Sequence, residues 1–336
     1  YVGTNLSNKL SKKYKVICVD TFWFGNHLND SVSYVKADIR NFDYKILNNI
    51  DVVINLAYLA NDPSCEIDAR ATWEIGPLSN YFLLEQCKKY KIKKFIFASS
   101  GSVYGIKKEK NVTEDLSLNP LTDYNKSKMI CEKVIENYSN DFDTVIIRPG
   151  TVGGFSKRLR LDVVVNILSY QAYFNKKIEI LGGNQIRPLI DMNDMINVYQ
   201  FCVEKKITGT FNVHNENMKV SNIAESIKKL IPCKIIVKKS NDPRSYRMNS
   251  DKIKNLKFQF KYSIKDSVQS LIDNFDDKES QPDSLLPNVR TDIVRYLQTK
   301  KYIEKLSLDY FSSPFKNVYT KYSAGILELM YSGYGA

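Results

Sequence analysis

Apolar residues in the first part of the chain form short blocks that are separated by longer amphipathic stretches. The blocks predict five buried strands, "YKVICVD" (14–20), "SYVKAD" (33–38), "DVVINLA" (51–57), "KFIFASS" (94–100) and "DTVIIRPG" (143–150). Helical periodicity lies between the last three, over 71–90 and 124–138. Because strands that alternate with helices form parallel sheets covered on both faces, the pattern predicts an α/β fold with a doubly wound parallel sheet.

Polar residues are concentrated where these predicted strands end. Asp20 and Asp38 close the first two strands, and "NLAYLAND", "SSGSVYG" and "RPGTVGG" accompany the ends of the other three. Ligands of open α/β sheets bind outside the carboxyl ends of the strands. The sequence therefore predicts a binding cleft at this edge of the sheet.

The chain starts with what reads as the second half of a dinucleotide-binding unit. Leu6, Leu10 and Tyr14 share helical spacing, and this helix leads into the strand that ends at Asp20. The preceding strand and the start of its glycine-rich turn are not in the sequence, and Gly3 is the one glycine left of that turn. We therefore expect a Rossmann-type sheet without its first strand. Such a chain should bind a dinucleotide less well, and be less stable, than one extended by that strand and turn.

The rhythm of the pattern changes after about residue 155, where short strands and turns replace the regular alternation. We predict a dinucleotide-binding domain over 1–155 and a smaller α+β substrate-binding lobe over 156–276. Some segments of the lobe are expected to return to the first sheet. A polar linker and a tail without recognisable chemistry follow over 277–336.

Charge and hydropathy narrow the classes of partner. The net charge is +12, but lysines are spread over the whole chain and no basic stretch is interleaved with aromatic residues. This distribution favours solvated surface charge over a nucleic-acid site, and it also suits an anionic small substrate. No apolar run approaches the roughly 18 residues needed to cross a bilayer, so we expect no membrane association.

Cysteine and histidine usage bears on compartment and on metal binding. The six cysteines are scattered without a CxxC pair, which indicates reduced thiols in a cytoplasmic protein. The two histidines are far apart in sequence, so we expect no metal site.

The strongest chemical pattern is "FASSGSVYG" (97–105) followed by "YNKSK" (124–128). Tyr124 and Lys128 are four residues apart on a predicted helix, so they share one face. A lysine ammonium beside a tyrosine favours tyrosinate and lowers the tyrosine pKa. Tyr124 could then exchange a proton with a substrate hydroxyl while hydride moves to or from a nicotinamide, and Ser100 could bond the same oxygen. A surface pair is the alternative, but the strand-end serines upstream favour a catalytic site.

Taken in order, these segments resemble the extended short-chain dehydrogenase/reductase family, in its NAD-dependent nucleotide-sugar epimerase/dehydratase branch. The likeness runs from residue 1 to about residue 275. Its marks are "YVG" at the end of the family's G-x-x-G-x-x-G, "VD" (19–20), "AD" (37–38), "NLA", "SSGSVYG", "NPLTDYNKSK", "RPGTVGG", "RPLIDMNDM" and "GTFNV". The resemblance implies NAD as cofactor and a nucleotide-diphosphate sugar as substrate.

The resemblance also implies roles for particular residues. Ser100, Tyr124 and Lys128 correspond to the family's catalytic triad, and Lys128 would also hold the nicotinamide ribose. Asp20 would accept hydrogen bonds from the adenosine ribose and so favour NAD over NADP, although capping of a loop is the alternative. The other implied cofactor-binding residues are Gly3 at the pyrophosphate, Asp38 and Ile39 beside adenine, and Ala57 in the groove.

Two arginines match family positions that grip the substrate diphosphate. They are Arg187 and Arg244, and a guanidinium suits that task through its planar fork, although a surface ion pair is the alternative for either. The sequence departs from the family at Gly76, where Asn is usual, and at Ser79-Asn80, where Gly-Thr is usual. Gly76-Pro77 should disturb the helix predicted there.

Family dehydratases carry an Asp-Glu pair directly after the strand-end Ser or Thr, and this chain has Gly101 and Ser102. Dehydration is therefore not expected, and transient oxidation of the sugar with return of hydride, a 4-epimerisation, is the default. Ketosugar reduction and oxidative decarboxylation stay open, with Glu114 as a candidate extra acid. A cofactor-binding regulator without chemistry is the alternative of a different class, although such proteins typically lose the Tyr or Lys.

Family members commonly form homodimers through the two helices that here would be 71–90 and 124–138. The candidate interface residues are Tyr81, Leu84, Ile130 and Val134, with core packing as the alternative for some of them. We therefore expect a homodimer built on a four-helix interface.

Overall fold

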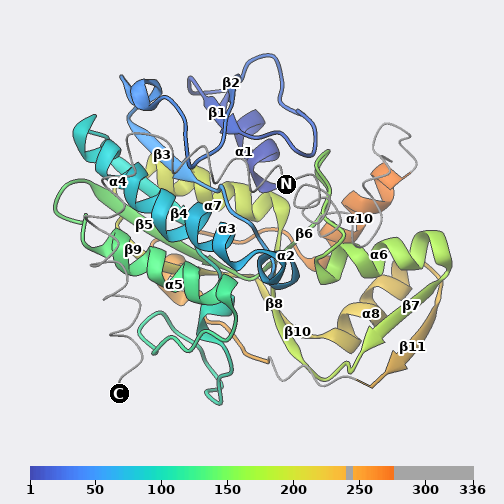
Figure 1. Ribbon diagram of the computed structural model, residues 1–336. Coiled ribbons are helices and arrows are strands. Elements are labelled where there is room, and N and C mark those ends of the chain that lie inside the picture. The colour runs from blue at the N-terminus through green and yellow to red at the C-terminus, as the bar shows by residue number, and fades with distance from the viewer. Residues whose placement is uncertain (240–244, 276–336) are drawn as a thin grey trace.

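The computed structural model describes residues 1–239 and 245–275. Its largest sheet is parallel throughout, with strand order β3-β4-β5-β9. These strands are β3 (Val52–Asn55), β4 (Lys94–Ala98), β5 (Asp143–Pro149) and β9 (Gly209–Val213). The predicted α/β fold with a parallel sheet is confirmed (Figure 1).

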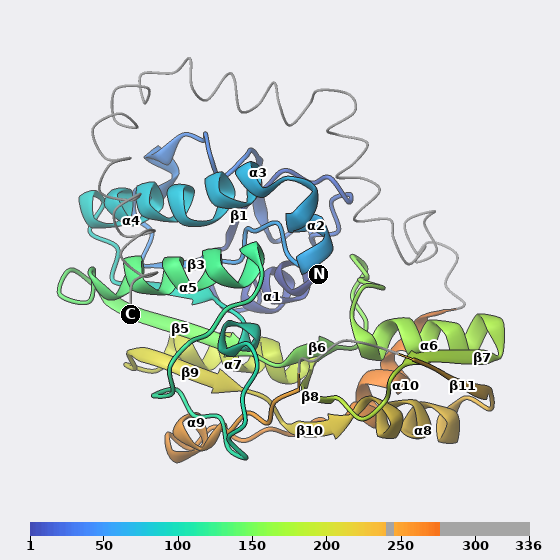
Figure 2. The same cartoon turned by 60° about the horizontal axis from the view of Figure 1, so that its bottom comes forward.

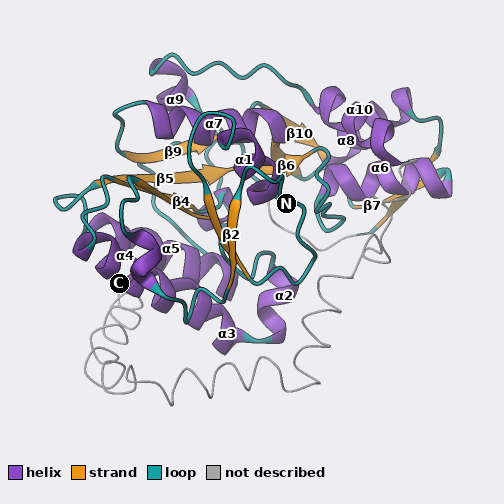
Figure 3. Ribbon diagram, turned by 90° about the horizontal axis from the view of Figure 1, so that it is seen from above, coloured by secondary structure: helices purple, strands orange, loops and turns teal. Residues whose placement is uncertain are grey.

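Helices cover both faces of this sheet, which lies between them in Figure 3. One face packs on α4 and α5, and the other on α1 and α7. These helices are α1 (Val2–Leu10), α4 (Ser79–Lys89), α5 (Asp123–Glu136) and α7 (Met192–Glu204). Alternate residues of β4 serve the two faces, because Phe95 and Phe97 pack with α4 and α5 whereas Ile96 packs with α1 and α7. Each of these fully buried side chains contributes about 1.5–3 kcal/mol, which explains the continuous apolar run.

The first two predicted strands form, but they make a separate parallel pair. They are β1 (Ile17–Asp20) and β2 (Ser33–Lys36), with Asp20 opposite Lys36. Within the described residues β1 is hydrogen-bonded to β2 and not to β3. The five predicted strands therefore lie in two parallel sheets rather than in one.

A smaller lobe lies beside the main sheet (Figure 2). Its apolar cluster joins three helices with a two-stranded parallel sheet. These elements are α6 (Val164–Asn175), β7 (Lys177–Leu181), α8 (Val220–Leu230), β11 (Lys234–Lys238) and α10 (Ile264–Phe275). A mixed sheet of β6 (Thr151–Gly153), β8 (Ile186–Asp191) and β10 (Glu216–Lys219) lies between the lobe and the main sheet. The remaining helices are α2 (Asp62–Ile67), α3 (Ala69–Trp73) and α9 (Asp251–Asn255).

The helix predicted over 71–90 is interrupted where Gly76-Pro77 was expected to disturb it. A π-helical turn, Glu74–Leu78, separates α3 from α4. Among the candidate interface residues, Leu84 is fully buried in the core between α4, α5 and the sheet, so it cannot contact a second subunit. Tyr81, Ile130 and Val134 are only partly buried, and the homodimer stays a prediction.

A buried histidine links β9 to the segment before α9. The side-chain amide of Asn217 donates to Nε2 of His214 at 2.8 Å, so the ring proton is on Nδ1 and is donated to Ser250 Oγ at 2.5 Å. Burial lowers the pKa of His214 from 6.5 to about 4. This network needs a neutral ring, because a proton on Nε2 would oppose the donor from Asn217.

We expect the network to make stability depend on pH. The unfolded chain binds a proton at His214 near pH 6.5 and the folded chain only near pH 4, so acidification through this range favours unfolding. The parent should lose up to about 3 kcal/mol between these values relative to His214→Gln. Urea denaturation at a series of pH values measures this difference. His27→Gln, at the other histidine, should keep the parent's pH dependence, and an equal slope in parent and His214→Gln would contradict the assignment.

Candidate active site

Two elements position the predicted triad. Helix α5 begins at its cap Thr122, whose hydroxyl accepts the backbone N–H of Asn125 at 3.3 Å, and this places Tyr124 and Lys128 one turn apart. Ser100 follows β4, and its hydroxyl caps the short 3₁₀ turn Gly101–Tyr104 by accepting Ser102 N–H at 3.2 Å. The end of a central strand and the first turn of a helix therefore converge.

Ser100 lies close enough to Tyr124 to lower the pKa of its phenol, while the Ser100 hydroxyl itself is 2.7 Å from Ser102 Oγ. Burial has the larger effect and raises the pKa of Tyr124 to about 12, against the lowering by the nearby charge of Arg160 and by Ser100. The direction is the reverse of the lowering expected from Lys128. Desolvation disfavours the phenolate here more than its neighbours favour it.

Lys128 is close to Tyr124 but its ammonium is directed elsewhere. Nζ donates to the Ala98 carbonyl at 2.5 Å and lies 6.0 Å from the centre of the Tyr124 ring. The side chain is almost fully buried, and burial lowers the pKa of Lys128 to about 7. In this structure Lys128 therefore does not supply the full, close positive charge that the spacing alone predicts.

The predicted cofactor-binding residues line the neighbouring strand ends. The N-terminus of α1 has no side-chain cap, and a Cβ on Gly3 would make an ordinary contact with Leu56 Cδ1 at 3.6 Å, so the packing described does not itself require glycine there. Asp20 is exposed at the end of β1 and accepts the backbone N–H of Phe22 at 2.7 Å. Asp20 therefore does cap its loop. Ala57 is partly buried just beyond β3.

Asp38 is held by a buried ion-pair network. Arg40 donates to both carboxylate oxygens of Asp38, at 3.0 and 2.9 Å, and also to Glu74 at 3.1 Å. The Arg40 guanidinium is 2% exposed, so these bonds are shielded from solvent. Asp38 is fixed in place by this network, while Ile39 packs between two apolar clusters beside it.

Buried donors indicate what kind of ligand fits this edge. Among the described residues, four buried side-chain groups that can donate hydrogen bonds have no partner in the protein, namely Trp23 Nε1, Ser64 Oγ, Asn80 Nδ2 and Asn125 Nδ2. Asn125 accepts a hydrogen bond from Ser102, which is 2.7 Å from Ser100 Oγ, and Trp23 packs in the same apolar cluster as Tyr124. A dinucleotide offers phosphate, ribose and amide oxygens that can accept such bonds, so the donor set fits it.

The structure describes one of the two arginines predicted to bind the substrate diphosphate. Arg187 lies partly buried on β8 and donates to the Ile186 carbonyl at 3.2 Å. Arg244 lies outside the described residues. The cation that does influence Tyr124 is Arg160, which donates to both oxygens of Asp162, at 2.9 and 2.6 Å. The basic run "KRLR" (157–160), just after the strand-end motif "RPGTVGG", was the available signal for it.

Glu114, the candidate extra acid, supports the backbone instead. Its carboxylate accepts the N–H of Asn212 on β9 at 2.7 Å. Asn212 in turn accepts the Tyr104 hydroxyl at 2.8 Å. Glu114 therefore fixes the loop after Tyr104 to the main sheet.

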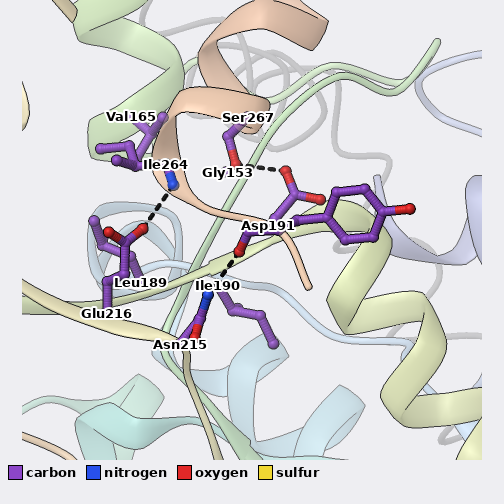
Figure 4. Close-up of a pocket in the computed structure, with 10 residues that line it drawn as sticks. Gly153, Val165, Leu189, Ile190, Asp191, Asn215, Glu216, Ile264 and Ser267 are labelled. Atoms are coloured by element: carbon purple, nitrogen blue, oxygen red, sulfur yellow. Dashed lines mark hydrogen bonds between the residues drawn. The ribbon is translucent and has the colours of Figure 1, made fainter. Parts of the chain in front are cut away.

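A small pocket lies away from this site, between β6, β8, α6 and α10 (Figure 4). Its empty space of about 200 Å³ is below the roughly 300–1,000 Å³ of ordinary ligand pockets. Its polar groups are already paired, since Ser267 donates to Asp191 at 2.6 Å and Ile264 N–H donates to Glu216 at 2.6 Å. We interpret this pocket as a packing gap where the lobe meets the sheets.

Comparison with family models divides the chain in two. The model of the NAD-dependent epimerase/dehydratase family matches residues 1–213. A second model, described as exopolysaccharide biosynthesis protein YbjH, matches residues 221–336. In the described ranges, no helix is long and apolar enough to cross a membrane.

Proteins of several organisms are similar to this chain. A putative UDP-glucose 4-epimerase of Methanocaldococcus jannaschii is 31% identical over 206 residues, which cover 58% of this chain and 68% of that protein. A dTDP-D-glucose 4,6-dehydratase of Dictyostelium discoideum is 28% identical over 267 residues, covering 69% of this chain and 59% of that protein. The UDP-glucuronic acid 4-epimerase of Bacillus cereus, solved with NAD, is 26% identical with a TM-score of 0.73, covering 84% of this chain and 97% of that one.

Proposed function

This chain belongs to the NAD-dependent epimerase/dehydratase family, and from that membership we propose that it is a nucleotide-sugar 4-epimerase. NAD is the family's cofactor, and nucleotide sugars are bound in similar solved structures, such as that of the Thermotoga maritima UDP-glucose 4-epimerase with UDP-glucose (21% identity, TM-score 0.74, 82% of this chain and 95% of that one). The observation that carries the proposal is the nearness of Ser100 to Tyr124, beside the closely packed Gly101 at the position of the dehydratase acid.

The packing at Gly101 supports epimerisation over dehydration. A Cβ on Gly101 would lie 2.5 Å from the sulfur of Met248 and 3.0 Å from the Pro149 carbonyl oxygen. Met248 is itself buried, and its backbone N–H is bonded to Asn217 at 3.0 Å. An aspartate at position 101 would therefore have to displace the buried Met248 side chain and would press on the Pro149 carbonyl oxygen.

The described residues suit a reversible proton transfer at one sugar oxygen. Tyr124 would take the proton of the 4-hydroxyl through its own oxygen and later return it, while Ser100 donates a hydrogen bond to the same oxygen. Arg160 and Ser100 favour the phenolate that this step needs. NAD, when bound, supplies the nicotinamide that accepts and returns the hydride. Lys128 and the backbone at the start of α1 would hold its ribose and pyrophosphate.

A product assay tests the proposal. The full chain is incubated with NAD and, in turn, UDP-glucose, UDP-glucuronic acid and UDP-N-acetylglucosamine, and the products are examined by mass spectrometry and NMR. We expect a product of unchanged mass with inverted configuration at C4 from at least one sugar. Loss of water, loss of carbon dioxide or net reduction would each contradict a 4-epimerase.

Cofactor preference tests the role proposed for Asp20. The 2′-phosphate of NADP would meet the Asp20 carboxylate, so NAD should bind at least about tenfold more tightly, which is roughly 1.4 kcal/mol. Asp20→Ala should narrow that ratio, as measured by calorimetric titration with both cofactors. Asp30→Ala, an exposed acid ahead of β2, is the matched control and should leave the ratio unchanged. Equal affinities in the parent would assign Asp20 to loop capping alone.

A further inference from the structure

Tyr58, directly after Ala57 at the end of β3, lies against the predicted catalytic lysine. Lys128 Nζ is 3.5 Å from the centre of the Tyr58 ring, 4.7 Å from that of Phe97 and 6.0 Å from that of Tyr124. Ring faces attract a cation, and the effect is strongest where water is excluded. The ammonium is therefore enclosed by aromatic rings, with Tyr58 the nearest.

The Tyr58 ring is itself fixed in this place. Its hydroxyl donates to Ser127 Oγ at 2.7 Å, and Ser127 donates to the backbone carbonyl of Tyr124 at 3.0 Å. The rings of Tyr58 and Tyr124 meet edge to face, with centres 5.9 Å apart. Tyr58 thus contacts the Lys128 ammonium and the Tyr124 ring, and its hydroxyl is linked through Ser127 to the Tyr124 backbone.

Gly76 provides the space for Tyr58. A Cβ at Gly76 would collide with the Tyr58 hydroxyl oxygen and would lie 2.8 Å from the ring carbon Cζ. Gly76 is buried in the π-helical turn between α3 and α4, and moving the ring away from the added methyl would break the bond from the Tyr58 hydroxyl to Ser127. The two residues form a matched pair, and this accounts for the glycine where the resemblance leads one to expect Asn.

The acidic groups near Lys128 do not pair with its ammonium. Glu132, one turn along α5, is committed to Arg148 at 2.6 Å, and no carboxylate of a described residue lies within ion-pair distance of Lys128. The thiols of Cys65 and Cys131 are buried, and burial raises the pKa of Cys131 to about 12, so that thiol is neutral. Lys128 Nζ donates its hydrogen bond to the Ala98 carbonyl.

We propose that Tyr58 is a positioning residue, whose ring face holds Lys128 Nζ over Ala98 and favours its protonated form, and that Gly76 is the residue that admits this ring. The catalytic consequence rests on the proposed function, because it matters through the part that Lys128 takes in the reaction. The arrangement itself is independent of turnover. Its test can therefore fail or succeed separately from the epimerase assay.

The test titrates Lys128 directly. Protein labelled with carbon-13 at lysine Cε is followed by NMR against pH, and Lys128→Arg assigns the signal. Tyr58→Phe keeps a ring face and should leave the pKa of Lys128 within a few tenths of the parent, whereas Tyr58→Leu should lower it by about one unit, a tenfold shift in protonation. Tyr58→Met serves if Tyr58→Leu does not fold. An unchanged pKa without the ring, or an equal fall in Tyr58→Phe, would overturn the proposal.

A second measurement tests the pairing with Gly76. Gly76→Ala should lower the melting temperature of the parent by about 5 °C, since the added methyl overpacks a fixed ring. In the Tyr58→Leu or Tyr58→Met background the same substitution should be neutral or stabilising, because alanine is the better helix residue. An equal loss in both backgrounds would show that Gly76 does not serve Tyr58.

Discussion

Replacing Tyr124 with phenylalanine is expected to lower kcat by about 10²–10⁴-fold, the usual contribution of a positioned acid–base group. The substitution removes the oxygen that exchanges the proton and keeps the ring that packs edge to face on Tyr58. The fold should be preserved, because the substitution removes one hydroxyl and leaves the packing of the ring unchanged. Turnover of the best sugar from the product assay, with thermal melting and NAD titration of the same samples, measures all three effects.

Tyr90→Phe is the matched control for this experiment. Tyr90 is a partly buried tyrosine at the C-cap of α4, just ahead of the start of β4, whereas Ser100 of the predicted triad follows the end of that strand. It should leave kcat within about twofold of the parent. Turnover in Tyr124→Phe within a few-fold of the parent would show that another group exchanges the proton.

Replacing Arg148 with methionine is expected to cost about 3–5 kcal/mol of folding free energy, because it leaves a buried carboxylate unpaired. Arg148 donates to Glu132 at 2.6 Å and to the Tyr104 hydroxyl at 2.8 Å, and the Glu132 side chain is 1% exposed. Glu132 also accepts from Ser99, the neighbour of Ser100. The loss should therefore disturb the strand end that positions Ser100. Chemical denaturation measures the change.

Two further variants separate the buried pair from an ordinary one. Glu132→Leu combined with Arg148→Met removes both charges and should recover a large part of the stability. Lys133→Met breaks a pair with Glu136 whose side chains are 60% and 48% exposed, and it should cost at most about 0.5 kcal/mol. A loss in Arg148→Met no larger than that in Lys133→Met would contradict a buried network.

The strands were predictable because their signal is local. Residues such as Phe95, Ile96 and Phe97 must all leave water, since both faces of a central parallel strand are covered by helices. The separation of β1 and β2 from the main sheet was not predictable, because hydrogen bonding between strands depends on which edges meet in space. The same limit applies to Leu84, which an amphipathic pattern assigns equally to a core or to an interface.

The candidate site also has features that local sequence spacing predicts and features that it does not. The spacing of Ser100 and Tyr124 on a strand end and a helix start predicts that they lie close together, and Ser100 is near enough to Tyr124 to affect the pKa of its phenol. The spacing of Tyr124 and Lys128 places them on one face of α5 but does not say where a long, flexible side chain points. Its direction, toward Ala98 and Tyr58, is set by residues from β4 and from the loop after β3.

The sequence by itself determined the α/β class, the family and the residue types of the triad, because these follow from periodicity and from motifs of contiguous residues. Only the tertiary structure decided the electrostatics: the burial that raises the pKa of Tyr124, the nearness of Arg160, and the pairing of Asp38 with Arg40. It also showed that the missing side chain at Gly76 leaves room for Tyr58, which lies 18 positions earlier in the sequence. Desolvation and Coulomb energies depend on distances in space and on excluded water, and neither can be read from separation along a chain.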